Sequence, residues 1–213
     1  MRVVAIDGPV GSGKSTVAKA VAERLDLPFL ESGAMYRVVA WAAVRRGIDL
    51  EAGEELTALA AQLDMEVGER VLVDGDDVTG DLRSPEVGRA VSAVAATPGV
   101  RTELVRRQRE WVEGHGGAVV EGRDIGSVVF PDAEVKVFLT ASAAERARRR
   151  SLDETADDLA RRDLLDSTRA VSPLIVPQGA VVVDTTGRPI DEVVDEIVGM
   201  LGRGPAGRSQ GAQ

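Results

Sequence analysis

A glycine-rich segment near the start of the chain carries the clearest chemical signal in the sequence. Residues 8–15 read GPVGSGKS and match G-x-x-x-x-G-K-[ST], between a predicted buried strand and a predicted helix. In such a loop, backbone N–H groups converge on phosphate oxygens, the lysine reaches the β- and γ-phosphates, and the final hydroxyl ligates Mg²⁺. The alternative is a glycine-rich turn that matches by chance, and the flanking strand and helix argue against it. We therefore predict an ATP site at Gly8, Pro9, Val10, Gly11, Ser12, Gly13, Lys14, Ser15 and Thr16, with Lys14 catalytic and Ser15 on the metal.

The motif leaves open what the triphosphate is used for. A GTPase switch needs an Asn-Lys-x-Asp segment to read guanine, and this sequence contains no asparagine. An ATPase motor needs more chain than the 213 residues present. A kinase for a small molecule fits the length, with part of the chain forming the acceptor site.

Separated arginines indicate what the acceptor would be. A sugar or alcohol acceptor needs a base to take the hydroxyl proton, whereas a phosphate acceptor is already ionised and needs cations instead. Arginine suits that task because its planar fork binds phosphate oxygens in pairs and stays charged. Taken singly, each of these residues is more often a solvated surface charge. The candidates are Arg37, Arg101, Arg123, Arg162 and Arg169.

The neighbourhoods of these arginines favour a site. Arg123 and Asp124 follow a predicted strand, and active sites of parallel sheets lie at the carboxyl ends of strands. Arg162, Asp166 and Arg169 are spaced for one helical face, so they form either ordinary ion pairs or a lid over the nucleotides. The arginines within residues 146–150 are interpreted as a solvated helix face.

The segment 31–37, ESGAMYR, has two interpretations. Ser32 is a candidate helix N-cap, and Gly33 and Ala34 remove bulk from the first turn. The same small residues could leave space for a phosphate that Arg37 holds. The two interpretations are compatible.

The apolar patterns alternate between strands and helices. Predicted strands cover residues 3–6, 29–30, 118–120, 135–139 and 181–183, and helices lie between them and at 190–201. Three short alternating runs at 65–67, 70–73 and 77–78 predict a small antiparallel meander. We therefore predict an α/β, three-layer P-loop fold with a central parallel sheet, an inserted subdomain carrying a small antiparallel sheet, and a short lid.

The predicted domain is a single kinase unit over residues 1–201. We expect an insertion that binds the nucleoside monophosphate and a lid, followed by a disordered, Gly- and Ser-rich tail. The expected parts are the core at about 1–32, 114–145 and 170–201, the insertion at 33–113, the lid at 146–169 and the tail at 202–213.

Composition excludes several classes of function. There is no cysteine, which removes disulfides and thiolate sites, and the one histidine, His115, lies in a glycine-rich context typical of a surface loop. A net charge of −9 disfavours a nucleic-acid polymer as partner. The early first strand and the absence of a long apolar run lead us to expect no signal peptide, no membrane span and a cytoplasmic protein.

Several stretches resemble bacterial cytidylate kinases, in the nucleoside monophosphate kinase group. They read GPVGSGKST, ESGAMYR, GDLRSPEV with SAVAATPGVR, EGRDIGSVVFPDAEVKVFLTAS and RRDLLDSTRAVSPL. The resemblance covers Val3 to about Leu201. Adenylate kinases share the first loop and a form of the second segment, but lack the hairpin insertion and the GRDIG stretch.

The resemblance implies a set of residues that read the base. These are Ser92, Arg101 and Asp124. The set makes chemical sense, because a carboxylate accepts from the exocyclic amine of cytosine while an arginine donates to its acceptors. Uracil presents a carbonyl in place of that amine, so Asp124 would face an unpaired acceptor.

The resemblance also implies residues for the phosphates and the ribose. Arg37 and Arg123 would bind the acceptor phosphate, beside Ser32. Arg162 and Asp166 would hold the ribose, and Arg169 would reach the phosphates. The implied catalytic set is Lys14, Arg123, Arg162 and Arg169.

The activity implied by the resemblance is ATP-dependent phosphorylation of CMP, and of dCMP, with Mg²⁺ as cofactor. We expect the chain to act as a monomer. The chain departs from the pattern at the lid, which is shorter than in some relatives, and at Glu121, where relatives can carry Asp. A role for Glu121 in holding Mg²⁺-bound water is a hypothesis. The alternatives are a kinase for another monophosphate, such as UMP, and a P-loop sensor that binds without transferring phosphate.

Overall fold

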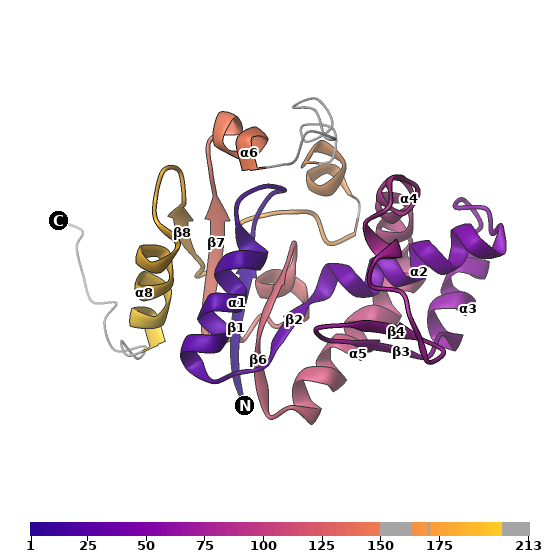
Figure 1. Ribbon diagram of the computed structural model, residues 1–213, viewed down its shortest axis with the longest axis horizontal. Coiled ribbons are helices and arrows are strands. Elements are labelled where there is room, and N and C mark those ends of the chain that lie inside the picture. The colour runs from indigo at the N-terminus through magenta and orange to yellow at the C-terminus, as the bar shows by residue number, and fades with distance from the viewer. Residues whose placement is uncertain (150–162, 170, 202–213) are drawn as a thin grey trace.

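A parallel sheet of five strands forms the centre of the molecule. The computed structural model describes residues 1–149, 163–169 and 171–201 (Figure 1). The strand order is β2-β6-β1-β7-β8, and every pair in it is parallel. The predicted parallel sheet is confirmed, with strands one or two residues longer than the apolar runs in most cases. The strands are β1 (Arg2–Asp7), β2 (Phe29–Glu31), β6 (Gly117–Gly122), β7 (Val135–Thr140) and β8 (Val181–Asp184).

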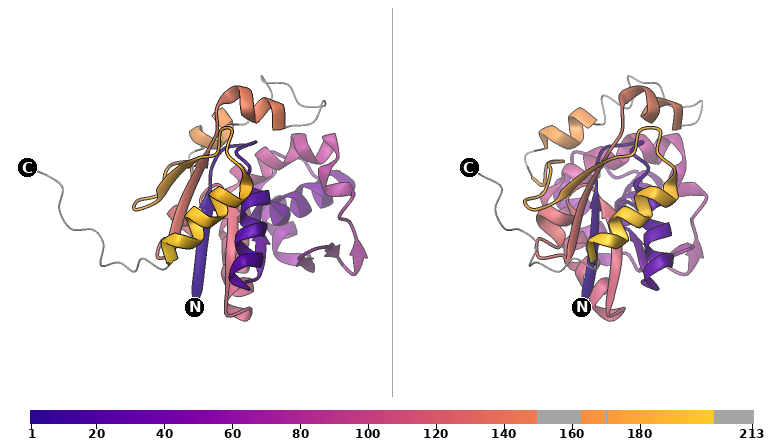
Figure 2. Two further views of the ribbon diagram at one scale, coloured as in Figure 1. Left: turned by 60° about the vertical axis from the view of Figure 1, so that its left-hand side comes forward. Right: turned by 90° about the vertical axis from the view of Figure 1, so that its left-hand side faces the viewer.

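Helices cover both faces of this sheet, which gives the predicted three layers (Figure 2). Alternate residues of β1 enter two different cores, since side chains alternate across a strand. Val4 and Ile6 pack with α1 (Lys14–Leu25) and α8 (Ile190–Leu201). Val3 and Ala5 pack on the opposite side with α2 (Ser32–Arg46) and α5 (Pro98–Gly114). Both cores therefore converge on β1 and fix the loop that follows it.

The segment between α2 and α5 forms the small antiparallel sheet that the sequence predicted. Strand β4 (Val71–Val73) lies between β3 (Met65–Val67) and β5 (Asp76–Asp77). Together with α3 (Gly53–Gln62) and α4 (Pro85–Ala96), it lies to one side of the parallel sheet in Figure 1. The division into core, insertion and lid stays a prediction.

Local sequence signals explain where α4 begins. Ser84 caps it by accepting a hydrogen bond from the backbone N–H of Val87, and Pro85 occupies the first turn. A short 3-10 turn, η1 (Asp81–Arg83), precedes the cap. The start of α2 differs from our prediction. Ser32 is its first helical residue rather than its cap, because its hydroxyl donates to the carbonyl oxygen of Glu121 at 2.8 Å.

Two further segments carry parts of the site. A π-helical turn, η2 (Ile125–Val129), follows β6 and had no sequence signal. Helix α6 (Ala143–Arg149) follows β7, and residues 163–168 are helical. The predicted lid residues 150–162, including Arg150 and Arg162, and the predicted tail 202–213 lie outside the described residues.

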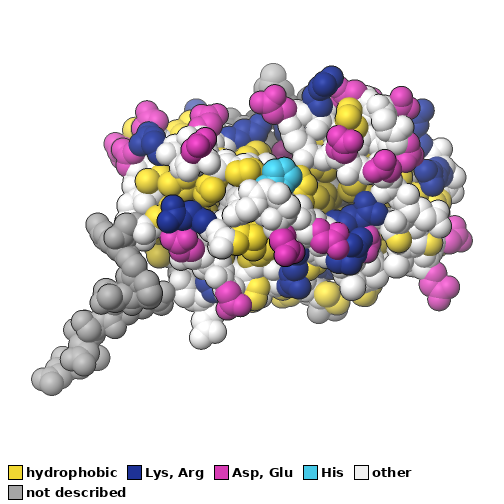
Figure 3. Space-filling view, turned by 90° about the horizontal axis from the view of Figure 1, so that it is seen from below, with side chains coloured by type: hydrophobic (Ala, Val, Ile, Leu, Met, Phe, Trp, Pro, Cys, Tyr) yellow, Lys and Arg dark blue, Asp and Glu magenta, His cyan; other side chains and the backbone are white. Residues whose placement is uncertain are grey.

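The surface carries mixed charge. On the face shown in Figure 3, positive and negative side chains are interspersed. His115 ends α5 in an exposed position, stacked on Trp111 with ring centroids 3.9 Å apart, as expected of a surface residue. Among the helices that the structure describes, none is both long enough and apolar enough to cross a membrane.

Candidate active site

The glycine-rich loop joins β1 to α1 at the carboxyl edge of the sheet. Gly8 has φ +147°, and a Cβ there would lie 2.1 Å from the carbonyl oxygen of Leu139. A larger residue would therefore collide with the end of β7. Gly13 immediately precedes the first residue of α1. Its φ of +88° is a left-handed conformation that glycine adopts without strain. These glycines aim the backbone of the loop toward the N-terminus of α1, where its unpaired N–H groups favour an anion.

Lys14 is buried within this loop. Its Nζ donates to the carbonyl oxygen of Pro9 at 2.7 Å. Burial lowers the pKa of Lys14 to about 7, and the charge of Arg123 acts in the same direction. The nearby carboxylates of Glu121 and Asp7 oppose this shift without cancelling it. A polyphosphate in the loop would add negative charge and favour the protonated lysine.

Glu121 connects the loop with α2. Its carboxylate accepts a hydrogen bond from the Ser15 hydroxyl at 3.1 Å, while its backbone carbonyl accepts from Ser32. Burial raises the pKa of Glu121, and Lys14 is the main group that opposes the rise. The end of β6 thus brings an acidic oxygen beside the hydroxyl that the sequence assigned to a metal.

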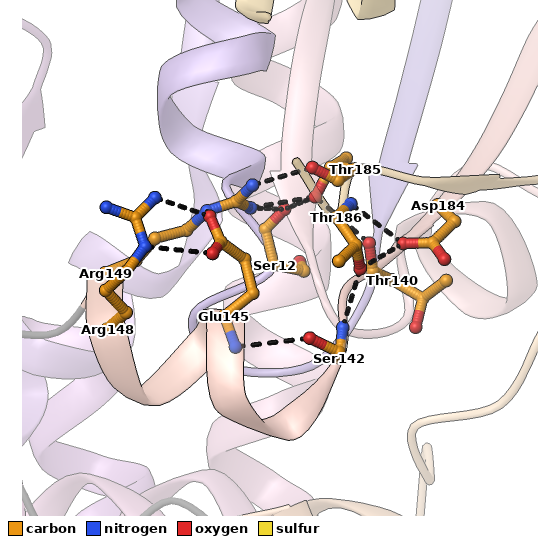
Figure 4. A network of polar contacts seen from close by, with 9 residues as sticks. All are labelled: Ser12, Thr140, Ser142, Glu145, Arg148, Arg149, Asp184, Thr185 and Thr186. Atoms are coloured by element: carbon orange, nitrogen blue, oxygen red, sulfur yellow. Dashed lines mark hydrogen bonds and ion pairs between the residues drawn. The ribbon is translucent and has the colours of Figure 1, made fainter. Parts of the chain in front are cut away.

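A polar network braces the loop from the side of α6 and β8 (Figure 4). The Thr185 hydroxyl contacts the carbonyl oxygens of Ser12 at 3.0 Å and Thr140 at 3.1 Å. Arg149 donates to that hydroxyl at 2.8 Å and to the carbonyl oxygen of Thr185 at 2.7 Å. Glu145 holds Arg149 in place at 2.8 Å. The network fixes the Ser12 peptide at the centre of the loop.

The interpretation of residues 146–150 as a solvated helix face was therefore wrong for two of its arginines. Arg146 and Arg149 both turn toward the loop, because the end of β7 places α6 directly over it. Arg148 alone among the described members matches the prediction, with a side chain 74% exposed.

The helical residues 163–168 also contact the loop. The backbone N–H of Val10 donates to the carboxylate of Asp163 at 3.2 Å, and Arg146 donates to the carbonyl oxygen of Val10 at 3.0 Å. Arg146 and Asp163 form an ion pair with each other. This segment of the predicted lid is thus tied to the donor loop.

Asp7, the last residue of β1, positions the loop that follows β6. Its two carboxylate oxygens accept the backbone N–H groups of Ile125 at 2.8 Å and Gly126 at 2.7 Å. Burial raises the pKa of Asp7 to about 6, although these two hydrogen bonds oppose the rise. Because Arg123 and Asp124 lie just before Ile125, Asp7 fixes the direction in which both leave the sheet.

Asp124 and Arg101 form a buried ion pair below this edge. Arg101 also donates to the carbonyl oxygen of Ala95 at 3.1 Å. Its guanidinium lies 5.4 Å from the ring centroid of Tyr36, within the range of a cation–π interaction. The structure therefore brings together two of the three residues assigned to the base, from α5 and from the loop after β6.

Arg123 and Arg169 share one carboxylate. Arg123 Nε donates to Asp166 Oδ2 at 2.8 Å, and Arg169 lies 3.6 Å from Asp166 Oδ1. Burial lowers the pKa of Arg169, which the charge of Asp166 opposes. The simpler interpretation of this spacing was ion pairing along one helical face. It explains only the 3.6 Å contact between Asp166 and Arg169, because Arg123 reaches Asp166 from the loop after β6. Arg162, the third member of the predicted face, lies outside the described residues.

The remaining acceptor candidates lie on α2 and α4. Arg37 lies one turn into α2 and donates to the carbonyl oxygen of Leu82 at 3.4 Å. Ser92 lies on α4 and is half-buried. The contacts of these residues with a nucleotide stay predictions.

Comparison with known proteins decides the family. A family model described as Cytidylate kinase matches residues 4–203. The chain belongs to the cytidylate kinase family. A cytidylate kinase from Desulfitobacterium hafniense is 49% identical over 213 residues, which cover 93% of this chain and 91% of that protein. The family resemblance inferred from the motifs is confirmed.

Other relatives in the family are longer. A bifunctional pantoate ligase/cytidylate kinase from Synechococcus sp. is 51% identical over 215 residues, or 92% of this chain. The chain spans only 40% of that protein's length. A solved gluconokinase from Sinorhizobium meliloti has a TM-score of 0.51 at 20% identity, covering 95% of this chain and 92% of that one. This likeness shows the fold alone.

Several described residues of this cytidylate kinase family member contact the site without having been predicted; they are Asp7, Tyr36, Arg146, Arg149, Asp163 and Thr185. Asp7 had a usable signal, since a carboxylate directly after the buried apolar run 3–6 must find partners at the sheet edge. Arg149, Thr185 and Tyr36 had none. Each acts through a neighbour distant in sequence, which local spacing does not reveal.

Proposed function

We propose that the chain catalyses ATP-dependent transfer of a phosphoryl group to CMP, and to dCMP. The main support for this proposal is the buried Arg101–Asp124 pair, which lies at the same sheet edge as the glycine-rich loop. A buried ion pair is a poor source of stability, which supports a role for this pair in recognition. The carboxylate of Asp124 suits the exocyclic amine of cytosine, and the family supports the same acceptor.

The donor side would bind ATP on the glycine-rich loop. Lys14 would neutralise the β- and γ-phosphates, and Ser15 with Glu121 offers the oxygen groups that Mg²⁺ prefers. Across the stretches that the structure covers, no group of three or more His, Cys, Asp or Glu side chains could hold a metal. That fits Mg²⁺, which commonly keeps water and substrate phosphates as most of its ligands. Bound Mg²⁺ would supply charge neutralisation of the phosphates.

The acceptor side would neutralise a second anion. Arg123 and Arg169 lie together around Asp166. An oxygen of the CMP phosphate would attack the γ-phosphorus of ATP, and the bond from that phosphorus to the β,γ-bridging oxygen would break. No base is needed, because the acceptor oxygen carries no proton at neutral pH. Further proposed ligands are Ser32 and Arg37 for the phosphate, Ser92 for the base and Arg162 for the ribose.

The setting proposed for this reaction is a monomer acting on free nucleotides in the cytoplasm. The net charge of −9 supports a small anionic ligand held by local arginines over a long polyanion.

A coupled assay of ADP formation tests the proposal. The chain is supplied with ATP, Mg²⁺ and, in turn, CMP, dCMP, UMP, AMP, GMP or dTMP. The proposal requires turnover with CMP, with dCMP next. Preference for a purine would overturn the acceptor assignment, and ATP binding without turnover of any monophosphate would indicate a sensor. Lys14→Met serves as the inactive control once its folding has been checked by circular dichroism.

A further inference from the structure

Val10, in the glycine-rich loop, is held on both sides of its backbone by one ion pair. Its N–H donates to the carboxylate of Asp163 at 3.2 Å, and its carbonyl oxygen accepts from Arg146 at 3.0 Å. Arg146 and Asp163 also pair with each other, and their side chains are only 16% and 20% exposed. The pair is therefore screened less by salt than one on the open surface. We name Val10, Arg146 and Asp163 together the clasp.

The clasp places a negative charge against the loop that is proposed to hold a triphosphate. Among the described residues, Asp163 is the one whose carboxylate accepts a hydrogen bond from a backbone N–H of residues 8–15. Phosphate oxygens are expected to bind backbone N–H groups of the same loop. Negative charges brought together in partly buried surroundings repel each other. The Asp163 carboxylate and a bound triphosphate therefore compete for the loop.

Arg146 is only partly used by its present partners. Its Nη1 donates to both the carbonyl oxygen of Val10 and the carboxylate of Asp163. Its Nε is buried and has no hydrogen-bond partner in the described part of the chain. A guanidinium binds phosphate best when two of its N–H groups donate side by side. A phosphate on the loop would thus be a better partner for Arg146 than Asp163 is.

Helix α6 does not depend on the clasp for its place over the loop. A Cβ on Gly11 would lie 3.0 Å from both the Cβ and the carbonyl oxygen of Arg146, so loop and helix are in close contact. Arg149 separately joins α6 to the carbonyl oxygen of Ser12 and to Thr185 (Figure 4). Asp163 can therefore leave the loop while the backbone of α6 stays in position and only the Arg146 side chain turns.

We propose that the clasp is an autoinhibitory contact on the donor loop, and that ATP opens it. The triphosphate repels the Asp163 carboxylate, and Arg146 exchanges its contact with Asp163 for one with a phosphate oxygen. Opening the clasp is then part of ATP binding, so the apparent affinity is lower than that of an already open loop. The inference rests on the proposed function, because its ligand is the proposed phosphoryl donor.

The test compares Asp163→Asn with the unchanged chain. Asparagine keeps an oxygen for the N–H of Val10 but removes the charge that pairs with Arg146 and repels the triphosphate. Calorimetry with a non-hydrolysable ATP analogue and Mg²⁺, without CMP, should give a Kd about fivefold lower for the variant. The melting temperature of the free variant should fall, because the ion pair is lost. A contact with a structural role alone would not give tighter binding together with lower stability.

Two further variants sharpen the measurement. Asp132→Asn makes the same change of net charge at an exposed position just before β7, at the opposite edge of the sheet from the loop. It should leave the Kd for the analogue unchanged. Arg146→Gln should raise that Kd, because the side chain that moves to the phosphate is gone.

The outcomes separate this inference from the proposed function. A higher Kd in Asp163→Asn would overturn the clasp, since Asp163 would then support the ATP-bound loop. An unchanged Kd, or a fall that Asp132→Asn reproduces, would overturn it in favour of a structural contact or a general charge effect. A lower Kd in Arg146→Gln would overturn the exchange of partners. All of these leave the proposed function standing, whereas failure of the unchanged chain to bind the analogue would overturn the donor site and this inference together.

Discussion

Asp124 and Arg101 form an ion pair whose side chains are 7% and 3% exposed. Removing two charges from water costs several kcal/mol for each, and pairing recovers that cost only in good geometry. The pair joins the loop after β6 to the first turn of α5. A polar contact at this depth can discriminate strongly between ligands, because an unmatched group of the ligand finds no water to replace the missing partner.

Asp124→Asn should therefore alter base selection. The amide keeps the shape of the carboxylate but offers an N–H in place of one acceptor oxygen. We expect kcat/KM for CMP to fall about 100-fold, and UMP to gain relative to CMP because its carbonyl can accept from the amide. Steady-state kinetics with both nucleotides measures the ratio. The KM for ATP is the internal control, and an equal loss for ATP and CMP would argue against a role confined to the acceptor.

Thr185→Val should weaken the binding of ATP rather than that of CMP. Valine keeps the volume of threonine but removes the hydroxyl that contacts Ser12 and Thr140 and accepts from Arg149. The Ser12 peptide loses part of its support, so we expect the Kd for ATP to rise about fivefold with little change for CMP. Isothermal titration calorimetry measures both constants. Thr102→Val, at an exposed threonine of α5, is the matched control. Weakened CMP binding with unchanged ATP binding would contradict the prediction.

The lowered pKa of Lys14 predicts uptake of a proton when ATP binds. With a pKa of about 7, the lysine is mostly neutral at pH 8 before binding. The triphosphate raises that pKa, so the lysine takes a proton from the buffer. Calorimetry at pH 8 in two buffers of different ionisation enthalpy should show an uptake of up to about one proton, which vanishes at pH 6, where the lysine is already charged.

Lys14→Met provides the control for that measurement. The variant has no amine to protonate, so its residual ATP binding should show no uptake at pH 8. Equal uptake by the variant would assign the proton to another group. Absence of uptake by the unchanged chain would mean that Lys14 is charged before ATP arrives.

The sequence predicted most of the fold because the spacing of its apolar residues differs between strands and helices. The buried runs of β1, β6 and β7, and the 3.6-residue pattern of α8, each satisfy a local rule that the tertiary structure also obeys. Ser32 is the instructive failure. Its sequence context is that of an N-cap, but a carbonyl oxygen of β6 lies within reach and captures the hydroxyl.

The site was predictable where a motif carries its own geometry. The glycine-rich loop is of this kind, since its backbone does the binding and glycine is required for that path. The bracing of the same loop was not predictable. Arg149 and Thr185 are brought to Ser12 by the packing of α6 and by the pairing of β8 with β7, both of which depend on contacts far apart in sequence. The surface interpretation of the arginine run failed for this reason.

Glu121→Gln should raise the melting temperature of the chain and weaken its response to Mg²⁺. Burial raises the pKa of Glu121 above its value in the unfolded chain, so the folded state holds its proton more tightly. For a carboxyl whose pKa is higher in the folded state, the free energy of unfolding falls as the pH rises above the pKa of that carboxyl in the unfolded chain. The neutral amide removes this loss, so the variant should melt at a higher temperature than the unchanged chain at pH 7.5, and its melting temperature should depend less on pH.

The same variant should respond more weakly to Mg²⁺. If the carboxylate beside Ser15 orients the ion's bound water, its loss should raise the Mg²⁺ concentration for half-maximal turnover about tenfold at fixed ATP. Glu31→Gln, at a half-buried carboxylate one strand away, controls for a general change of charge. A variant that melts higher but keeps its Mg²⁺ response would assign Glu121 to the connection between Ser15 and α2 alone. A variant that melts lower would mean that attraction to Lys14 outweighs the cost of burial.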